Sequence, residues 1–376
     1  MSHPTAVIPP SAHTRRNSAV ELLRITAMIM IILSHCSVHD VFPTEPSAFS
    51  YNNYILDWCI LGNLGVDIFM LISGYFLSQK ENPTGSLPRL WAQVFTYSLF
   101  CAGLFLLTGH PRSEISWAYV FFPTIHNTYW FFSAYMIFLL LTPYINRMLR
   151  TITRGQLGTC ISIMILFWAF FPAITQIQLY GDVLPTFLMF YLIGAYFRKY
   201  PKNRFSHLAF RLTTVLISFL LLFFSSALFR HHGPALGSWA RYNTFFYERN
   251  SILAVLTTVS LFSMFIYLPP FHSKLINWIG GCTFGIYLLH DNGLIRSVLW
   301  QEWLPKYNYY HTKWLLPGIL ISAAIVMTAG TLAESLRRIT IDKPFSAVVT
   351  GVLQKLQSLG NKLICTSGDC STQKEG

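Results

Sequence analysis

Long apolar runs separated by short polar segments dominate this chain. A helix rises 1.5 Å per residue, so roughly 20 apolar residues cross the ~30 Å hydrocarbon core of a bilayer. The pattern therefore predicts an all-α, polytopic integral membrane protein with about ten transmembrane helices. The expected spans are residues 20–38, 59–79, 90–109, 129–148, 157–173, 182–198, 208–229, 251–268, 278–298 and 315–336.

Lysines and arginines concentrate in alternate loops between these runs. Most of the 27 basic residues fall on one side, including Arg15, Arg16 and the group from Arg147 to Arg154. Cytoplasmic loops carry such an excess, so we expect both termini in the cytoplasm. We expect residues 1–18, which are polar, to form a disordered cytoplasmic N-terminus and residues 19–344 to form the transmembrane domain. Residues 345–376 then form a cytoplasmic amphipathic stretch and polar tail.

Composition supports a membrane protein and excludes several other classes. Hydrophobic residues make up 53% of the 376 positions and charged residues only 11%, which leaves too little polar surface for a soluble chain. The net charge of +12 lies in short loops rather than on one face, so it does not indicate nucleic-acid binding. The seven cysteines form no CxxC pair and suit buried apolar positions, so we expect neither a disulfide framework nor a metal site.

The first apolar run carries two ionisable residues, Arg24 and His35. Eleven residues separate them, which places both on one face of a helix, roughly 16 Å apart along its axis. An arginine inside a spanning helix costs about 2.5–3.5 kcal/mol on insertion scales, which favours a functional cleft. In the alternative, Arg24 snorkels and pairs with Glu21 while His35 is an interface histidine.

Other ionisable residues fall at a similar predicted depth. Asp67 lies about two turns below the outer end of the second span, and His290 and Asp291 lie in the outer half of the ninth. Polar groups in hydrocarbon face the bundle interior or a wet cavity and pair with one another. Packing at a helix kink is the alternative for His290 and Asp291. For Glu334 we expect a local ion pair with Arg337 or Arg338.

Four motifs in order make the chain resemble acyltransferase family 3, the polytopic O-acyltransferases of bacterial surface glycans. The first is the spacing of Arg24 and His35. The others are Asn63 to Tyr75 (NLGVDIFMLISGY), Tyr129 to Phe132 (YWFF) with Leu141 to Asn146 (LTPYIN), and Thr283 to His290 (TFGIYLLH). The last two are similar to the single-domain branch that includes the acetyltransferase of enterobacterial common antigen. The matches cover nearly the whole chain.

The resemblance implies an O-acetyltransferase of the bacterial inner membrane that uses cytoplasmic acetyl-CoA and acylates a cell-surface or lipid-linked polysaccharide. Arg24 then anchors the anionic donor, and Arg89 in the first inner loop contributes to donor binding. A histidine is suited to take the proton of a sugar hydroxyl at neutral pH, so His35 is the candidate base. Asp67 orients His35 as the third group of a triad does, and His290 is a second catalytic or acceptor-binding residue.

Two alternatives remain open at this point. The same mechanism serves succinyl-CoA or a longer acyl donor, because pocket size, which decides between donors, cannot be read from sequence. In a transporter or flippase of a glycan or small solute, the buried charges instead form a proton or substrate relay. Cys36 is a weak candidate for an acyl-carrying nucleophile because it faces about 100° away from His35.

Overall fold

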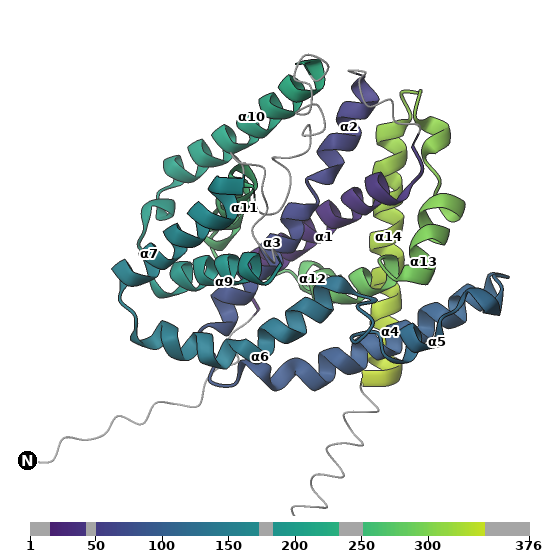
Figure 1. Ribbon diagram of the computed structural model, residues 1–376, viewed down its shortest axis with the longest axis horizontal. Helices are drawn as coiled ribbons and strands as arrows, with labels where there is room; N and C mark the ends of the chain where they lie inside the picture. Colours follow the sequence, from purple (N-terminus) through teal and green to yellow (C-terminus); the bar gives the residue numbers. More distant parts are fainter. Residues whose placement is uncertain (1–15, 43–49, 173–182, 233–250, 343–376) are drawn as a thin grey trace, which may run out of the picture.

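A computed structural model describes residues 16–42, 50–172, 183–232 and 251–342 as a bundle of helices (Figure 1) with no strand in these ranges. The first half contains α1 (Ser18–His39), α2 (Tyr51–Ile60), α3 (Asn63–Leu77), α4 (Leu87–Leu107), α5 (Trp117–Phe121), α6 (Trp130–Thr151) and α7 (Arg154–Ile165). The second half contains α9 (Val183–Lys199), α10 (Leu208–His232), α11 (Ile252–Ile266), α12 (Lys274–His290), α13 (Gly293–Ser297) and α14 (Leu315–Arg337). The predicted all-α class is confirmed.

Helix α1 lies at the centre of the bundle and packs against α3 and α12, while α3 packs against α9 and α12 against α14. Glycines allow these close approaches. A methyl group at Gly65 would overlap the carbonyl oxygen of Ala27 on α1, and one at Gly74 would overlap that of Tyr191 on α9. Small residues of this kind let helix backbones approach one another in membranes. Within the motif from Asn63 to Tyr75, Gly65 and Gly74 therefore have a packing role.

Six of the helical segments are long and apolar enough to cross a bilayer, within the part of the chain that the structure describes. They are Ser18–His39, Tyr51–Leu77, Pro83–Leu107, Trp130–Thr151, Leu208–Leu228 and Leu315–Asp342. The shorter apolar helices Arg154–Phe170 and Ile252–Ile266 match two further predicted spans. A multi-pass membrane protein follows, and the exact number of ten crossings stays a prediction.

The predicted span 278–298 is not one continuous helix. Helix α12 begins at Lys274 and ends at His290, and a new short helix, α13, begins at Gly293. Asn292 caps α13 by accepting a hydrogen bond from Leu294 N. An N-cap asparagine satisfies backbone donors that a continuous helix would pair internally, so it stabilises the break. This break fixes Asp291 at the end of α12.

The bundle exposes large apolar side chains on its outer helices. Leu216 on α10 is 60% exposed and Ile321 on α14 is 61% exposed, with other leucines and phenylalanines beside them. A soluble monomer rarely exposes such continuous apolar surface, whereas lipid chains cover it in a bilayer. The outward faces of α10 and α14 are therefore the lipid-facing surface.

The first and last described segments meet on one side of the molecule. The guanidinium groups of Arg16, just before α1, and Arg338, just after α14, both lie beside Gly281 on α12. This agrees with both termini lying on one side of the membrane, and their cytoplasmic placement stays a prediction. The predicted segments 1–18 and 345–376 lie outside the described residues, except that residues 16–18 lead into α1.

Candidate functional site

A cavity of about 300 Å³ runs along one face of α1. Its α1 lining consists of Arg24, Met28, Ile31 and His35, which are spaced by four, three and four residues. This spacing forms a single stripe on a helix. Residues from α3, α4, α6 and α12 complete the wall. Arg24 and His35, which the sequence predicted to share a face, thus line one cavity.

His35 is held by a second histidine, from α12. Its Nδ1 lies 3.0 Å from Nε2 of His290, and Nδ1 of His290 lies 2.7 Å from the carbonyl oxygen of Ile286. A carbonyl oxygen only accepts, so His290 Nδ1 carries the proton and a neutral His290 presents its Nε2 as an acceptor. His35 Nδ1 then donates to His290. The lone pair of His35 is consequently on Nε2, to which no described residue donates a hydrogen bond.

The carboxylate of Asp291 lies beside His35. Its Oδ1 lies 3.7 Å from His35 Nδ1 and accepts a hydrogen bond of 3.3 Å from Arg296 Nη1. The Asp291 side chain is only 3% exposed, so its charge is little screened by water. A negative charge at this distance stabilises the imidazolium that forms when His35 accepts a proton.

The break between α12 and α13 is braced from α6. Asn292 donates from Nδ2 to the hydroxyl of Tyr129 at 2.7 Å, and that hydroxyl donates to the carbonyl oxygen of Leu288 at 3.0 Å. Tyr129 and Asn292 are both buried. These bonds fix the end of α12, and with it the positions of His290 and Asp291 relative to α1. The YWFF motif therefore contributes a bracing tyrosine.

Three residues of this cluster have the side chains that a metal ion binds. One ligand atom from each of His35, His39 and Asp291 lies within 4.8 Å of the other two. However, His35 Nδ1 already pairs with His290, and the Arg296 guanidinium supplies positive charge beside Asp291. A cation here would displace a hydrogen bond and approach a like charge. The geometry therefore favours an ion-pair cluster at this position.

At the other end of the cavity, Arg24 forms the predicted pair with Glu21 and also lines the cavity wall. The ion pair joins Arg24 Nη1 to Oε1 of Glu21, three residues earlier. Arg16 Nε donates to the same oxygen at 2.7 Å. Glu21 is 2% exposed, whereas the Arg24 side chain is 24% exposed. The pair thus keeps Arg24 at the cavity wall and leaves its remaining N–H groups available.

Two predicted site residues lie elsewhere. Asp67 on α3 is fully buried and does not line the cavity, although its neighbours Val66 and Phe69 do. Arg89 on α4 is 74% exposed and forms a 3.3 Å ion pair with Asp342. It does not line the cavity either. The structure thus places Asp291 beside His35 and Arg89 at the surface, and the predicted role of Asp67 stays a prediction.

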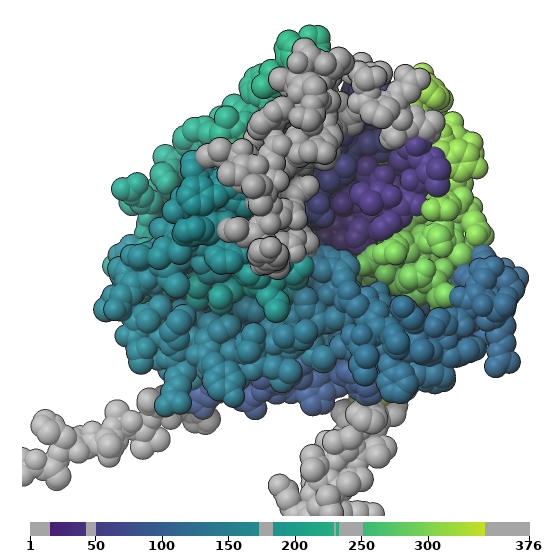
Figure 2. Space-filling model, in the orientation of Figure 1, coloured from purple at the N-terminus to yellow at the C-terminus, as the bar shows by residue number. Residues whose placement is uncertain are grey.

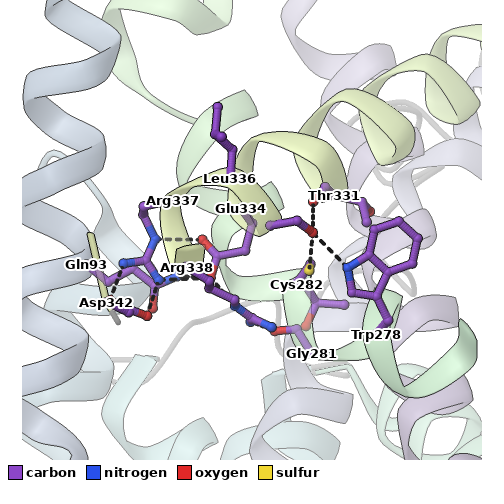
Figure 3. Close-up of polar contacts among 12 residues, drawn as sticks. Gln93, Trp278, Gly281, Cys282, Thr331, Glu334, Leu336, Arg337, Arg338 and Asp342 are labelled. Atoms are coloured by element: carbon purple, nitrogen blue, oxygen red, sulfur yellow. Dashed lines mark hydrogen bonds and ion pairs between the residues drawn. The ribbon is translucent and has the colours of Figure 1, made fainter. Parts of the chain in front are cut away.

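Glu334 on α14 is the centre of a separate buried cluster (Figure 3). It accepts hydrogen bonds from Gln93 and Tyr97 on α4, from Arg337 at the end of its own helix and from Arg338 just after it, at 2.8 to 3.1 Å. The predicted local ion pairs with Arg337 and Arg338 are therefore confirmed. Arg337 also bonds Asp342 at 2.7 and 2.9 Å.

The connection after α13 is tied to the end of α1. Asp40, which follows His39, accepts a hydrogen bond of 2.5 Å from Lys306 N. Burial raises the pKa of the Asp40 carboxyl and lowers the pKa of the Lys306 amine. Gln301 Nε2 also donates to the carbonyl oxygen of His39 at 2.9 Å. These contacts hold the end of α1 that carries His35.

Several residues in or beside the cavity were not singled out from the sequence. His39 follows His35 by four residues, and its ring lies 5.2 Å from that of His35. The i, i+4 spacing places both histidines on one face of α1, so the sequence could have indicated this pair. Tyr135 lines the cavity, and its hydroxyl lies 3.2 Å from Ser73 Oγ. This contact joins two helices, so the spacing of residues along the sequence does not predict it. Arg16 is also part of the wall.

The fold and the cavity define a multi-pass helical membrane protein with a half-buried, cavity-lining histidine. Within that class, a family model described as an acyltransferase domain matches residues 17–333. This match spans most of the chain, so the protein belongs to acyltransferase family 3 and is a membrane acyltransferase. Searches of curated proteins and of solved structures gave no match. The narrower resemblance to the common-antigen branch stays a prediction.

Proposed function

We propose that this protein is an O-acetyltransferase that moves an acetyl group from cytoplasmic acetyl-CoA to a hydroxyl of a cell-surface or lipid-linked polysaccharide. The observation that carries the proposal is the single cavity that joins Arg24 to His35. Bacterial surface glycans are made at the cytoplasmic membrane, so we place the protein in the bacterial inner membrane. Membership in an acyltransferase family favours this function over transport of a solute.

His35 is the general base in this proposal. The hydrogen bonds through His290 to the Ile286 carbonyl leave the lone pair of His35 on Nε2. A sugar hydroxyl becomes an effective nucleophile when a base removes its proton as the new bond forms. Asp291 takes the role predicted for Asp67, because its carboxylate lies close enough to stabilise the resulting imidazolium.

The donor enters from the Arg24 end. Roughly 16 Å separates the levels of Arg24 and His35 along α1, which is about the length of an extended pantetheine arm. The cavity wall between them is mostly apolar, with Met28 and Ile31 on α1. Such a wall suits the arm, while the guanidinium of Arg24 suits the anionic end of the coenzyme. The thioester then lies near His35.

The reaction needs no further reactant. The acceptor hydroxyl gives its proton to His35 Nε2 as its oxygen bonds to the thioester carbonyl carbon. The carbon–sulfur bond then breaks, and the coenzyme thiolate takes the proton back from the imidazolium. The products are an O-acetyl ester and free coenzyme A, and His35 is neutral again. Proton transfer by such a base contributes about 10²–10⁴-fold to the rate.

The acceptor has a separate approach to α1. Figure 2 shows a hollow whose floor is formed by α1, with α12 to α14 on one side and the segment from α4 to α6 below. In this proposal the sugar approaches α1 from this face. The imidazole lies on α1, where the two substrates meet in this proposal.

The test is His35→Gln in a strain that makes the polysaccharide. Proton NMR of the purified polysaccharide reports the acyl group directly, because an acetyl ester gives one methyl singlet and a succinyl ester gives methylene signals. We expect the acetyl singlet in the wild-type strain and its loss in His35→Gln. Membrane levels of both proteins are compared by immunoblot.

His110→Gln is the matched control, because His110 pairs with Glu302 outside the cavity. It removes one histidine and should leave acetylation unchanged. Full acetylation in His35→Gln at normal protein levels would refute the assigned base. A polysaccharide with no acyl signal that depends on the wild-type gene would refute the proposed function itself. Succinyl signals would move the proposal to the alternative donor.

A further inference from the structure

We propose that Arg16 and Arg338 bind the diphosphate of the acyl-CoA donor beside Gly281 on α12. This inference rests on the proposed function and assigns its phosphate site to residues from both ends of the described chain. The proposal moves donor binding away from Arg89 in the first predicted inner loop, because Arg89 lies outside the cavity and pairs with Asp342.

Two guanidinium groups converge at Gly281. A methyl group built on this glycine would lie 3.2 Å from Arg338 Nη1 and 3.3 Å from Arg16 Nη1. Like charges repel each other, so two arginines brought to one point favour an anion between them. Gly281 and Arg16 are both part of the cavity wall.

Arg338 is held in place by contacts that do not use all its donors. Its Nε donates to Glu334 at 2.8 Å, and its Nη2 donates to the carbonyl oxygen of Gly281. Figure 3 shows this side chain reaching from Glu334 to Gly281. Its Nη1 donates to no described residue. Because the fixed side chain loses little further freedom on binding, its Nη1 is well suited to a phosphate oxygen.

Arg16 likewise keeps donors for a ligand. Its Nε bonds Glu21 at 2.7 Å, whereas neither of its η nitrogens bonds a described residue. Its side chain is 52% exposed, so a ligand can reach it. A planar guanidinium presents paired N–H groups that match phosphate oxygens, and such charge-assisted bonds are roughly twice as strong as neutral ones.

The local charge balance favours an anionic ligand. Arg16 and Arg24 line this end of the cavity and Arg338 lies beside Gly281 in its wall, while the adjacent carboxylate, Glu21, is shared between Arg16 and Arg24. Glu334 is shared between Arg338 and its neighbour on α14. Positive charge therefore exceeds negative charge at this end. The diphosphate of coenzyme A brings two negative charges and sits one pantetheine length from the thioester.

The experiment measures acetyl transfer by the purified full-length protein in nanodiscs with three donors. Acetyl-CoA carries the diphosphate and the 3′-phosphate, acetyl-dephospho-CoA carries the diphosphate alone, and S-acetylpantetheine carries neither. We expect Arg16→Gln and Arg338→Gln each to raise KM about tenfold for the first two donors, as loss of one charge-assisted contact would. Neither variant should change KM for S-acetylpantetheine, and kcat should stay within about twofold.

Three outcomes would overturn the assignment. Unchanged KM with acetyl-CoA would show that the arginines do not contact the donor. A loss of the effect with acetyl-dephospho-CoA would assign them to the 3′-phosphate and not to the diphosphate. An equal rise in KM with S-acetylpantetheine would show a general distortion of the cavity.

The control is Arg150→Gln, which removes an exposed arginine of α6 on the same predicted side of the membrane. Its KM for all donors should equal that of the wild type. Thermal unfolding of every variant checks the fold, and Arg16→Gln tests the site independently because Arg16 does not contact Glu334. If wild-type protein transfers no acetyl group from any donor, the proposed function fails. Transfer with unchanged variants refutes only the phosphate site.

Discussion

The cluster around Glu334 on α14 and the cluster of His35, His290 and Asp291 between α1 and α12 differ in how completely their polar groups are paired. Glu334 accepts five hydrogen bonds from four side chains, so both of its oxygens are fully occupied. His35 pairs through one ring nitrogen only, and its other nitrogen has no donor among the described residues. A carboxylate whose oxygens are all hydrogen-bonded cannot accept a further bond from a substrate, whereas the unpaired ring nitrogen of His35 can. The completeness of pairing therefore indicates a structural role for Glu334 and a chemical role for His35.

Their surroundings differ in the same sense. The Glu334 carboxylate is fully buried and none of its partners lines the cavity, while His35 is 18% exposed and forms part of the cavity wall. Both clusters join α12 to a neighbouring helix, α14 in one case and α1 in the other. Substitution of Glu334 should reduce stability, and substitutions in the second cluster should reduce kcat.

The largest expected effect is on stability, from Glu334→Ala. It leaves the guanidinium of Arg337, which is 8% exposed, without one of its two carboxylates. Removing one partner of a buried ion pair costs about 3–5 kcal/mol. We expect a lower midpoint of thermal unfolding in detergent and less protein in the membrane.

The matched change is Glu302→Ala, which removes an exposed carboxylate paired with His110 and should leave the midpoint unchanged. Any Glu334→Ala protein that folds should keep its KM for an acceptor. A variant with wild-type stability and no kcat would place Glu334 in the chemistry and break the comparison.

Sequence reasoning was successful where partners lie on one helix. The shared face of Arg24 and His35 and the pairing of Glu334 with Arg337 and Arg338 follow from helical spacing alone. It could not pair residues that come from different helices. Depth in the membrane placed Asp67, His290 and Asp291 at a level similar to that of His35, but it did not show which helices are neighbours. The partners His35 and His290 are 255 residues apart, and their contact depends on which helices are neighbours.

Helix ends were the second difficulty. The residues Asp291, Asn292 and Gly293 carry a turn and N-cap signal inside an apolar run, which hydropathy averages away. This break gives Asp291 its position beside His35. Likewise, nothing local in the sequence pairs Arg89 with Asp342, because 253 residues separate them.

The second prediction concerns His290 as a positioning residue. His290→Leu removes the acceptor for His35 Nδ1, so His35 is free to adopt the tautomer with its proton on Nε2. We expect kcat to fall about 100-fold with an unchanged KM for acetyl-CoA, because tautomer control is a large part of triad catalysis. Stability should change little compared with Glu334→Ala.

His290→Gln is the sharper comparison. Its amide can donate to the Ile286 carbonyl and accept from His35 at the same time, so kcat should stay within about tenfold of the wild type. Equal losses in the Leu and Gln variants would show that His290 only fills space, and the hydrogen-bond argument would then be wrong.

The smallest expected effect concerns the carboxylate that assists His35, for which Asp291 and Asp67 are the two candidates. Asp291→Asn keeps the shape of the side chain and removes the charge that lies 3.7 Å from His35 Nδ1. We expect kcat to fall about tenfold, which corresponds to ~1.4 kcal/mol of lost stabilisation of the imidazolium. Arg296, which pairs with Asp291 at 3.3 Å, is 38% exposed, so water can solvate it in the variant. Asp67→Asn is the paired measurement, because Asp67 is buried outside the cavity wall and its loss should appear in the unfolding midpoint rather than in kcat. If instead Asp67→Asn lowers kcat and Asp291→Asn does not, the orienting carboxylate is the one that the sequence predicted, and proximity in the structure has assigned the wrong partner.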